Sequence, residues 1–193
     1  SKVVINFSRS ILAAEKIAKE CESLGGEILL CQADVSSDDD CRRMVDETLA
    51  KWNRLDVLVN NAGTTKFVQH PDLDGLSSED FEHIYGVNVV GPFQMVRAAR
   101  RALKASGDGS IVNVASIAGV KGVGSSIAYA ASKGALITMG KSLARVMGPE
   151  VRVNTVCPGF ITGDWLAEGM GKETYEASKA FLEAKTPLQA TCT

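Results

Sequence analysis

Short apolar runs and longer amphipathic segments alternate along most of the chain. The apolar runs are rich in Val, Ile and Leu, which is typical of buried strands, and they cover residues 2–7, 28–31, 55–59, 111–114 and 151–156. The segments between them carry apolar residues at helical spacing and cover residues 12–24, 38–52, 77 to about 104, and 129–147. This order predicts parallel β-α-β units with right-handed crossovers, and therefore a doubly wound α/β sheet with helices on both faces.

Residues 160–185 depart from this alternation. They contain no further strand pattern, and their large apolar side chains stand among small and charged residues: Trp165, Leu166, Met170, Tyr175 and Phe181. Because the segment follows the last predicted strand, we interpret it as a lid over a ligand site, with core packing of these side chains as the alternative. No low-complexity linker divides the chain, so we expect residues 1–193 to form a single domain.

Composition and charge remove several classes of function. The 21 basic and 23 acidic side chains give a formal net charge of −2, so the chain has no electrostatic signature of a protein that binds nucleic acid or an anionic membrane. No run approaches the roughly 20 apolar residues of a membrane span. The five cysteines form no metal-ligand pattern, and we expect reduced thiols and no metal site. These features favour a soluble, cytoplasmic protein.

Tyr129 and Lys133 are the strongest local candidates for chemistry. Residues four apart lie on the same face of a helix, so the two side chains are neighbours. Ser116 follows the strand predicted at 111–114, at the carboxyl end where open parallel sheets bind ligands. Taken singly, the Tyr–Lys spacing also suits a surface pair, and Ser116 also suits the cap of a turn.

Two further polar features accompany this trio. Asn60, Asn61, Ala62 and Gly63 follow the strand predicted at 55–59, and their small side chains leave room for a ligand at the sheet edge, although a plain turn explains them equally well. Asn88 lies in an apolar mid-helix segment, where a buried amide must find a hydrogen-bond partner. A structural polar residue of the core is the alternative for Asn88.

The ordered combination of these residues resembles the short-chain dehydrogenase/reductase family. The resemblance rests on the motif at 60–63, on Asn88, Ser116, Tyr129 and Lys133, and on the Pro158–Gly159 pair that ends the last strand, and it extends from residue 2 to about residue 186. One departure is Thr162, which stands one place earlier than the threonine expected after Pro–Gly.

The resemblance implies an NAD(P)(H)-dependent oxidoreductase that interconverts a secondary alcohol and a ketone. It implies Tyr129 as acid/base, Lys133 as the group that binds the nicotinamide ribose and lowers the tyrosine pKa, Ser116 as the holder of the substrate oxygen, and Asn88 as support for a water relay. A 3-oxoacyl reductase and a sugar or polyol dehydrogenase remain open as subclasses of small-molecule carbonyl or alcohol chemistry. The resemblance also implies a homodimer or homotetramer.

The expected cofactor residues are spread over several predicted strand ends. Ser8 and Arg9 follow the first strand and suit a 2′-phosphate, whereas a carboxylate typical of NAD-preferring members is absent there, so NADP(H) is preferred and NAD(H) is possible. An exposed arginine in a solvated turn is the alternative. By resemblance, Asp34 and Val35 meet the adenine, with a helix-capping or turn aspartate as the alternative for Asp34. The resemblance forms the nicotinamide side from Asn61, Ala62, Gly63, Tyr129, Lys133, Pro158, Gly159 and Ile161.

The glycine-rich phosphate turn of the family does not occur in the 193 residues. We therefore expect a fold that lacks its first strand and its C-terminal strand, and a parent of about 250 residues from which this chain derives by loss of both ends. A noncatalytic nucleotide-binding or scaffold protein of the same fold, or an inactive fragment, is the alternative to an enzyme. A glycine-rich turn directly upstream of Ser1 would favour the enzyme.

Overall fold

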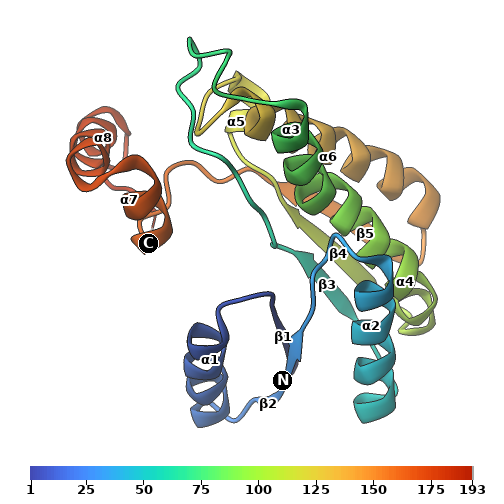
Figure 1. The fold of residues 1–193 in the computed structure, drawn as a ribbon. Helices are drawn as coiled ribbons and strands as arrows, with labels where there is room; N and C mark the ends of the chain where they lie inside the picture. The colour runs from blue at the N-terminus through green and yellow to red at the C-terminus, as the bar shows by residue number, and fades with distance from the viewer. Residues whose placement is uncertain (193) are drawn as a thin grey trace.

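Five parallel strands form two sheets in the computed structural model, which describes residues 1–192 (Figure 1). The strands are β1 (Lys2–Phe7), β2 (Glu27–Gln32), β3 (Val57–Asn60), β4 (Gly109–Val114) and β5 (Val151–Val156). β1 pairs with β2, with Val3 opposite Ile28, and β3–β4–β5 form the second sheet. Within residues 1–192, β1 and β3 do not pair with each other. This division matches a doubly wound sheet whose two halves lack a shared central strand.

Helices connect the strands as the sequence predicts. They are α1 (Ile11–Ser23), α2 (Asp38–Trp52), α3 (Ser78–Tyr85), the π-helix η1 (Gly86–Val90), α4 (Gly91–Ala105), α5 (Ala118–Lys121), α6 (Ile127–Met147), α7 (Asp164–Met170) and α8 (Lys172–Lys185). Local chemistry sets several starts: Ser37 caps α2, and Ser77 and Asp80 form a capping box at α3. The short α5 was not expected from the sequence.

The long helix expected from residue 77 to about residue 104 is not uniform. α3, η1 and α4 follow one another without a break, but the turn at 86–90 is wound as a π-helix. A π-turn adds one residue to the helix and frequently marks a functional site. Here it contains Asn88, the one polar side chain in an otherwise apolar stretch, which is fully buried.

The helices form layers on the strands, and the layers are unequal. Figure 1 shows α2, α4 and α6 together on one side and α1 on the other, beside β1 and β2. Leu58, Leu103, Ile111 and Val151 belong to the buried core between β3–β5 and the larger layer. On the opposite side of β3, alternate residues are exposed: Val57 by 53% and Val59 by 55%.

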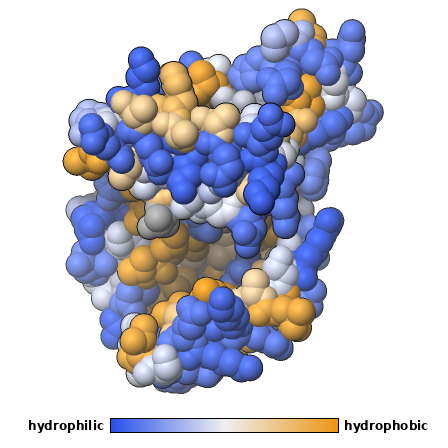
Figure 2. Space-filling model, turned by 90° about the vertical axis from the view of Figure 1, so that its left-hand side faces the viewer, coloured by the Kyte–Doolittle hydropathy of each residue, from blue (hydrophilic) through white to orange (hydrophobic). Residues whose placement is uncertain are grey.

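Helices lie on both faces, as predicted, but they cover the two faces unequally. In residues 1–192, α1 covers only the β1–β2 part of its side, and Figure 2 shows a hollow with apolar surface at its base on that face of the molecule. The continuous valine-rich run of β3 is typical of strands that are buried on both faces. The sequence therefore did not reveal that one face of β3 is exposed.

The segment interpreted as a lid consists of α7 and α8. Phe67 from the loop after β3 reaches α7, where its ring centre lies 5.7 Å from that of Trp165. Tyr175 is buried against Phe160, whereas Trp165 and Phe181 are more than half exposed. Some lid side chains thus pack internally, and Trp165 is left open at the surface.

The described residues also bear on membranes and metals. No helix among residues 1–192 has the length and apolar content needed to cross a membrane. Over the same residues, no group of three or more His, Cys, Asp or Glu side chains is arranged to hold a metal ion. All five cysteines are free.

Candidate active site

The carboxyl ends of β3, β4 and β5 gather the candidate residues at one edge of the sheet. Ser116 comes two residues after β4, and the Pro158–Gly159 pair follows β5. A hydrogen bond from the Ile117 amide to the Pro158 carbonyl, 3.0 Å long, ties these two strand ends together. Helix α6 crosses the same edge and presents Tyr129 and Lys133.

Lys133 is held inside the protein, and no carboxylate among residues 1–192 pairs with it. Its side chain is 4% exposed, and its Nζ donates to the Val114 carbonyl over 2.8 Å. Burial lowers the Lys133 pKa to about 8, because the ammonium loses most of its hydration. The same Nζ lies 5.7 Å from the centre of the Tyr129 ring.

The phenol of Tyr129 has a raised pKa. Burial is the main cause, and the neighbouring Ser116 hydroxyl opposes the rise. Lys133 does not contribute to this shift, since its Nζ donates to the Val114 carbonyl, and a lowering of the Tyr129 pKa by Lys133 stays a prediction for the cofactor-bound protein. Tyr129 is therefore a protonated phenol at neutral pH, in the form that can donate a proton.

Asn88 fastens the loop after β3 to α6. Its Oδ1 accepts from the Thr64 amide (2.8 Å), and its Nδ2 donates to the Thr64 carbonyl and to Ser132 Oγ, both over 2.9 Å. Next to Thr64, a Cβ on Gly63 would lie 3.5 Å from both Asn88 Oδ1 and Lys133 Nζ. The motif at 60–63, Asn88 and Lys133 are thus brought together.

Several hydrogen bonds that the sequence did not reveal shape the same edge. Ser126 caps α6 and accepts from the Tyr129 amide (3.2 Å), and Thr65 Oγ1 lies 2.8 Å from Ser125 Oγ. Deeper in the sheet, Asn60 Nδ2 donates to Asn113 Oδ1 over 2.9 Å and joins β3 to β4. The Ser126 cap can be read from the sequence, but the Thr65–Ser125 and Asn60–Asn113 contacts join residues more than 50 positions apart and leave no local signal.

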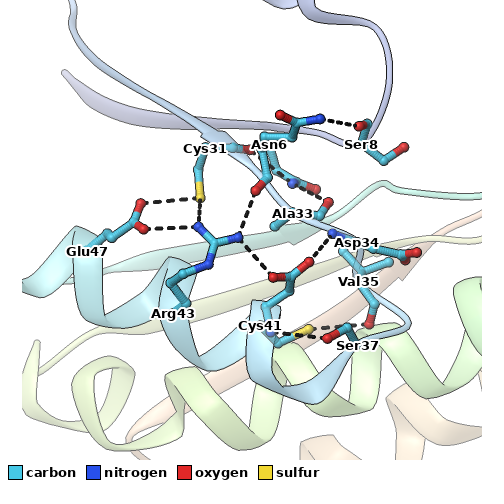
Figure 3. Close-up of polar contacts among 12 residues, drawn as sticks. Asn6, Ser8, Cys31, Ala33, Asp34, Val35, Ser37, Cys41, Arg43 and Glu47 are labelled. Carbon is cyan, nitrogen blue, oxygen red and sulfur yellow. Dashed lines mark hydrogen bonds and ion pairs between the residues drawn. The ribbon is translucent and has the colours of Figure 1, made fainter.

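The residues expected at the adenosine end lie on the other sheet. Figure 3 shows the loop after β2, where Asp34 is held by a hydrogen bond from its amide to Asp40 (2.8 Å). Asp34 Oδ1 also accepts from the amide and the hydroxyl of Ser36, so this carboxylate closes its own turn as well as facing outward. The alternative of a turn aspartate is therefore real for Asp34.

Ser8 and Arg9 follow β1 and are exposed. The Ser8 carbonyl accepts from Gln32 Nε2 over 3.0 Å, which links the ends of β1 and β2. No carboxylate stands at residues 6–10, so a hydroxyl and a guanidinium are the side chains available there for a phosphate. The donor set fits an adenosine 2′-phosphate at this end.

Three of the residues expected at the nicotinamide follow β5: Pro158, Gly159 and Ile161. Gly159 packs near Ile117, with 3.7 Å between its would-be Cβ and Ile117 Cδ1, so Pro158 and Gly159 lie beside the Ser116 loop. Ile161 instead is 45% exposed and forms a parallel bridge with Cys192. The place of Ile161 beside the nicotinamide therefore stays a prediction.

A family model described as short chain dehydrogenase matches residues 1–173. The chain belongs to this family, and it is an oxidoreductase of the short-chain dehydrogenase/reductase type. It is 41% identical over 190 residues to a protein described as ketoacyl reductase 2 of the granaticin polyketide synthase from Streptomyces violaceoruber, covering 98% of this chain and 74% of the relative.

Two other relatives agree with this assignment. A 3-oxoacyl-[acyl-carrier-protein] reductase from Synechocystis is 34% identical over 173 residues, covering 89% of this chain and 68% of that protein. A crystal structure described as a short-chain dehydrogenase/reductase from Burkholderia xenovorans superposes with a TM-score of 0.88 at 36% identity, covering 99% of this chain and 74% of that one.

Proposed function

We propose that the protein reduces the ketone of a 3-oxoacyl-type substrate with NADPH, and that Tyr129 is the proton donor. The observation that carries this proposal is the cluster of Ser116, Tyr129 and Lys133, in which a buried lysine lies beneath a protonated phenol. The substrate class follows the two relatives named as ketoacyl and 3-oxoacyl reductases. A sugar or polyol dehydrogenase is the second candidate subclass, supported by the family alone.

The residues of the chain have distinct parts in this reaction. A bound reduced nicotinamide supplies the hydride that reaches the carbonyl carbon. Ser116 donates a hydrogen bond to the carbonyl oxygen, where negative charge develops, and Tyr129 gives its phenolic proton to that oxygen. Lys133 holds the nicotinamide ribose and, as an ammonium, stabilises the phenolate that remains. Asn88 keeps the Thr64 segment in place beside them and supports the water chain that returns the proton.

The cofactor would extend from this cluster to the end of β1. Ser8 and Arg9 would bind the 2′-phosphate of NADP(H), with NAD(H) as the weaker alternative. Asp34 and Val35 would meet the adenine, and Asn61, Ala62, Gly63, Pro158 and Gly159 would flank the nicotinamide half. Ile161, two residues after Gly159, would complete this set.

The lid favours an apolar substrate. Trp165 is 56% exposed, and its ring is tilted against that of Phe67. Thr65 and Val68, which flank Phe67 in the sequence, both hydrogen-bond to Ser125, which lies four positions before Tyr129. The aromatic pair Phe67 and Trp165 is therefore held next to α6, the helix that contains Tyr129. We assign residues 160–185 as a substrate lid within a single catalytic domain.

The exchange Tyr129→Phe in the full-length protein tests the chemistry. It removes the proton donor but little volume, so turnover should fall by at least about 100-fold while NADPH binding, followed by nucleotide fluorescence, stays unchanged. Tyr85→Phe at the end of α3 is the matched control and should behave like the wild type. Near-normal turnover of the best ketone by Tyr129→Phe would refute the assignment.

A nucleotide-binding scaffold of the same fold is the alternative function. It shares the fold and the expected nucleotide site with the enzyme. If the full-length protein binds NADPH but reduces no ketone across an acyl and a polyol panel, the scaffold is the better description.

A further inference from the structure

The carbonyl of Val35 is held by donors from two helices. Gln94 Nε2, from α4, donates to it over 2.9 Å, and Cys41 Sγ, from α2, lies 3.3 Å away (Figure 3 shows the Cys41 contact). Gln94 is 8% exposed, so its amide is a buried polar group placed among the apolar residues of the core. Such a group is costly unless it is hydrogen-bonded, and the carbonyl of Val35 is the partner it has.

Gly91 brings α4 unusually close to the same residue. A Cβ at position 91 would lie 2.8 Å from Val35 Cγ2 and 3.0 Å from the Val35 carbonyl oxygen. These separations are too short for any side chain, so the backbone of α4 packs directly on Val35. Gly91 and Gln94 are three residues apart and lie on one face of the helix.

The same continuous helix reaches the catalytic end. Asn88, three residues before Gly91, holds Thr64 and Ser132. At 1.5 Å per residue, Asn88 and Gln94 lie about 9 Å apart along the axis. One rigid segment, η1–α4, thus contacts the loop beside Lys133 at one point and the loop after β2 at another.

We propose that Gln94 is a positioning residue for the adenine end of the cofactor: it fixes Val35 against α4, so that the Val35 side chain forms one wall of the adenine site at a set distance from the catalytic cluster. The inference rests on the proposed nucleotide-dependent function. Gln94 touches neither adenine nor substrate in this scheme, and it acts through Val35.

Loss of the amide should affect one half of the dinucleotide only. Without Gln94, the Val35 carbonyl keeps only the thiol of Cys41, which is a weak donor. Val35 then loses its hydrogen bond to α4, although Asp40 still holds the Asp34 amide, whereas the contacts of Asn88, Ser116, Tyr129 and Lys133 are unchanged. A purely structural role of Gln94 would instead weaken both halves together or lower stability alone.

The test uses two fragments of the cofactor and the full-length protein. Calorimetric titration with 2′,5′-ADP reports the adenosine half, and titration with reduced nicotinamide mononucleotide reports the other half. For Gln94→Met, which keeps the volume, we expect binding of 2′,5′-ADP and of NADPH to weaken about tenfold, from the lost hydrogen bond, and binding of the mononucleotide to stay within about twofold.

Thr48→Val is the matched control. Thr48 is a buried polar residue of α2 whose hydroxyl bonds only within its own helix, to Met44, so its loss should leave both fragments unaffected. Gln94→Asn, whose shorter amide cannot reach Val35, serves as a milder second variant and should show the same selective loss.

The outcomes separate the two proposals. Unchanged 2′,5′-ADP binding in Gln94→Met or Gln94→Asn, or equal weakening of both fragments, overturns the role of Gln94 while leaving the proposed function intact. A wild-type protein that binds neither fragment overturns both.

Discussion

Desolvation controls the ionisation of the two residues at the centre of the site. It lowers the Lys133 pKa to about 8 and raises that of Tyr129. Both shifts favour the neutral form, as expected when groups leave water without an opposite charge nearby. The site is thus prepared for a cofactor, since a ribose hydroxyl would give Lys133 a second partner and its ammonium would then act on Tyr129.

The depressed Lys133 pKa predicts how stability depends on pH. The folded protein releases this proton near pH 8 and the unfolded chain near 10.5, so the unfolded state binds more protons in that window and the folded state gains stability as pH rises through it. The gain should amount to at most about 3 kcal/mol. Urea unfolding at several pH values between 7 and 10.5, with Lys133→Met as the reference that lacks the group, measures it. Parallel curves for the two proteins would contradict the prediction.

At the scale of elements, the π-turn η1 explains how one amide can serve two segments. Its extra residue places Asn88 where its side chain meets both the amide and the carbonyl of Thr64, and where Nδ2 also reaches Ser132 on α6. Thr64 lies in the loop after β3, outside any strand, and Asn88 provides hydrogen-bond partners for its backbone amide and carbonyl. The turn therefore has a structural effect in addition to its proposed catalytic one.

Asn88→Ala should consequently cost both stability and turnover. It leaves the partly buried amide and carbonyl of Thr64 without their partner, and we expect a loss of about 2–4 kcal/mol in the free energy of unfolding. Asn154→Ala, at an exposed position of β5, is the control and should stay within about 0.5 kcal/mol of the wild type. Chemical denaturation of the three proteins decides the matter, and a loss below 1 kcal/mol for Asn88→Ala would show that water replaces the amide.

For the whole molecule, apolar surface remains where the layers are incomplete. The β3 face at Val57 and Val59 is bare within the described residues, and on the opposite layer Val90, Phe93 and Val146 are exposed by 46%, 44% and 69%. Exposed apolar groups on neighbouring helices favour association. Val90, Phe93 and Val146 therefore support a two-fold contact between two copies of the protein through α4 and α6.

We expect the full-length protein to be a homodimer or homotetramer. Phe93→Glu places a charge in the expected contact and should shift the mass measured by light scattering toward the monomer, while Leu24→Glu, at an 88% exposed position after α1, should not. A monomeric mass for the wild type at micromolar concentration would exclude the contact.

The sequence by itself determined the order of strands and helices, the parallel sheet, and the neighbourhood of Tyr129 and Lys133. These follow from local rules, because the periods of strand and helix set which side chains share a face, and because parallel strands end at a common edge. The predicted lack of a first strand also agrees with the two separate sheets, β1–β2 and β3–β4–β5, of residues 1–192.

Tertiary structure alone decided the rest. The π-turn at Asn88, the bond from Gln94 to a residue 59 positions away, and the bare face of β3 all depend on how distant segments pack. The upward shift of the Tyr129 pKa has the same origin, because the charge on Lys133 can be read from the sequence but the loss of water around the phenol cannot. Local periodicity fixes which way a side chain faces, and only packing fixes what it meets and how much water it keeps.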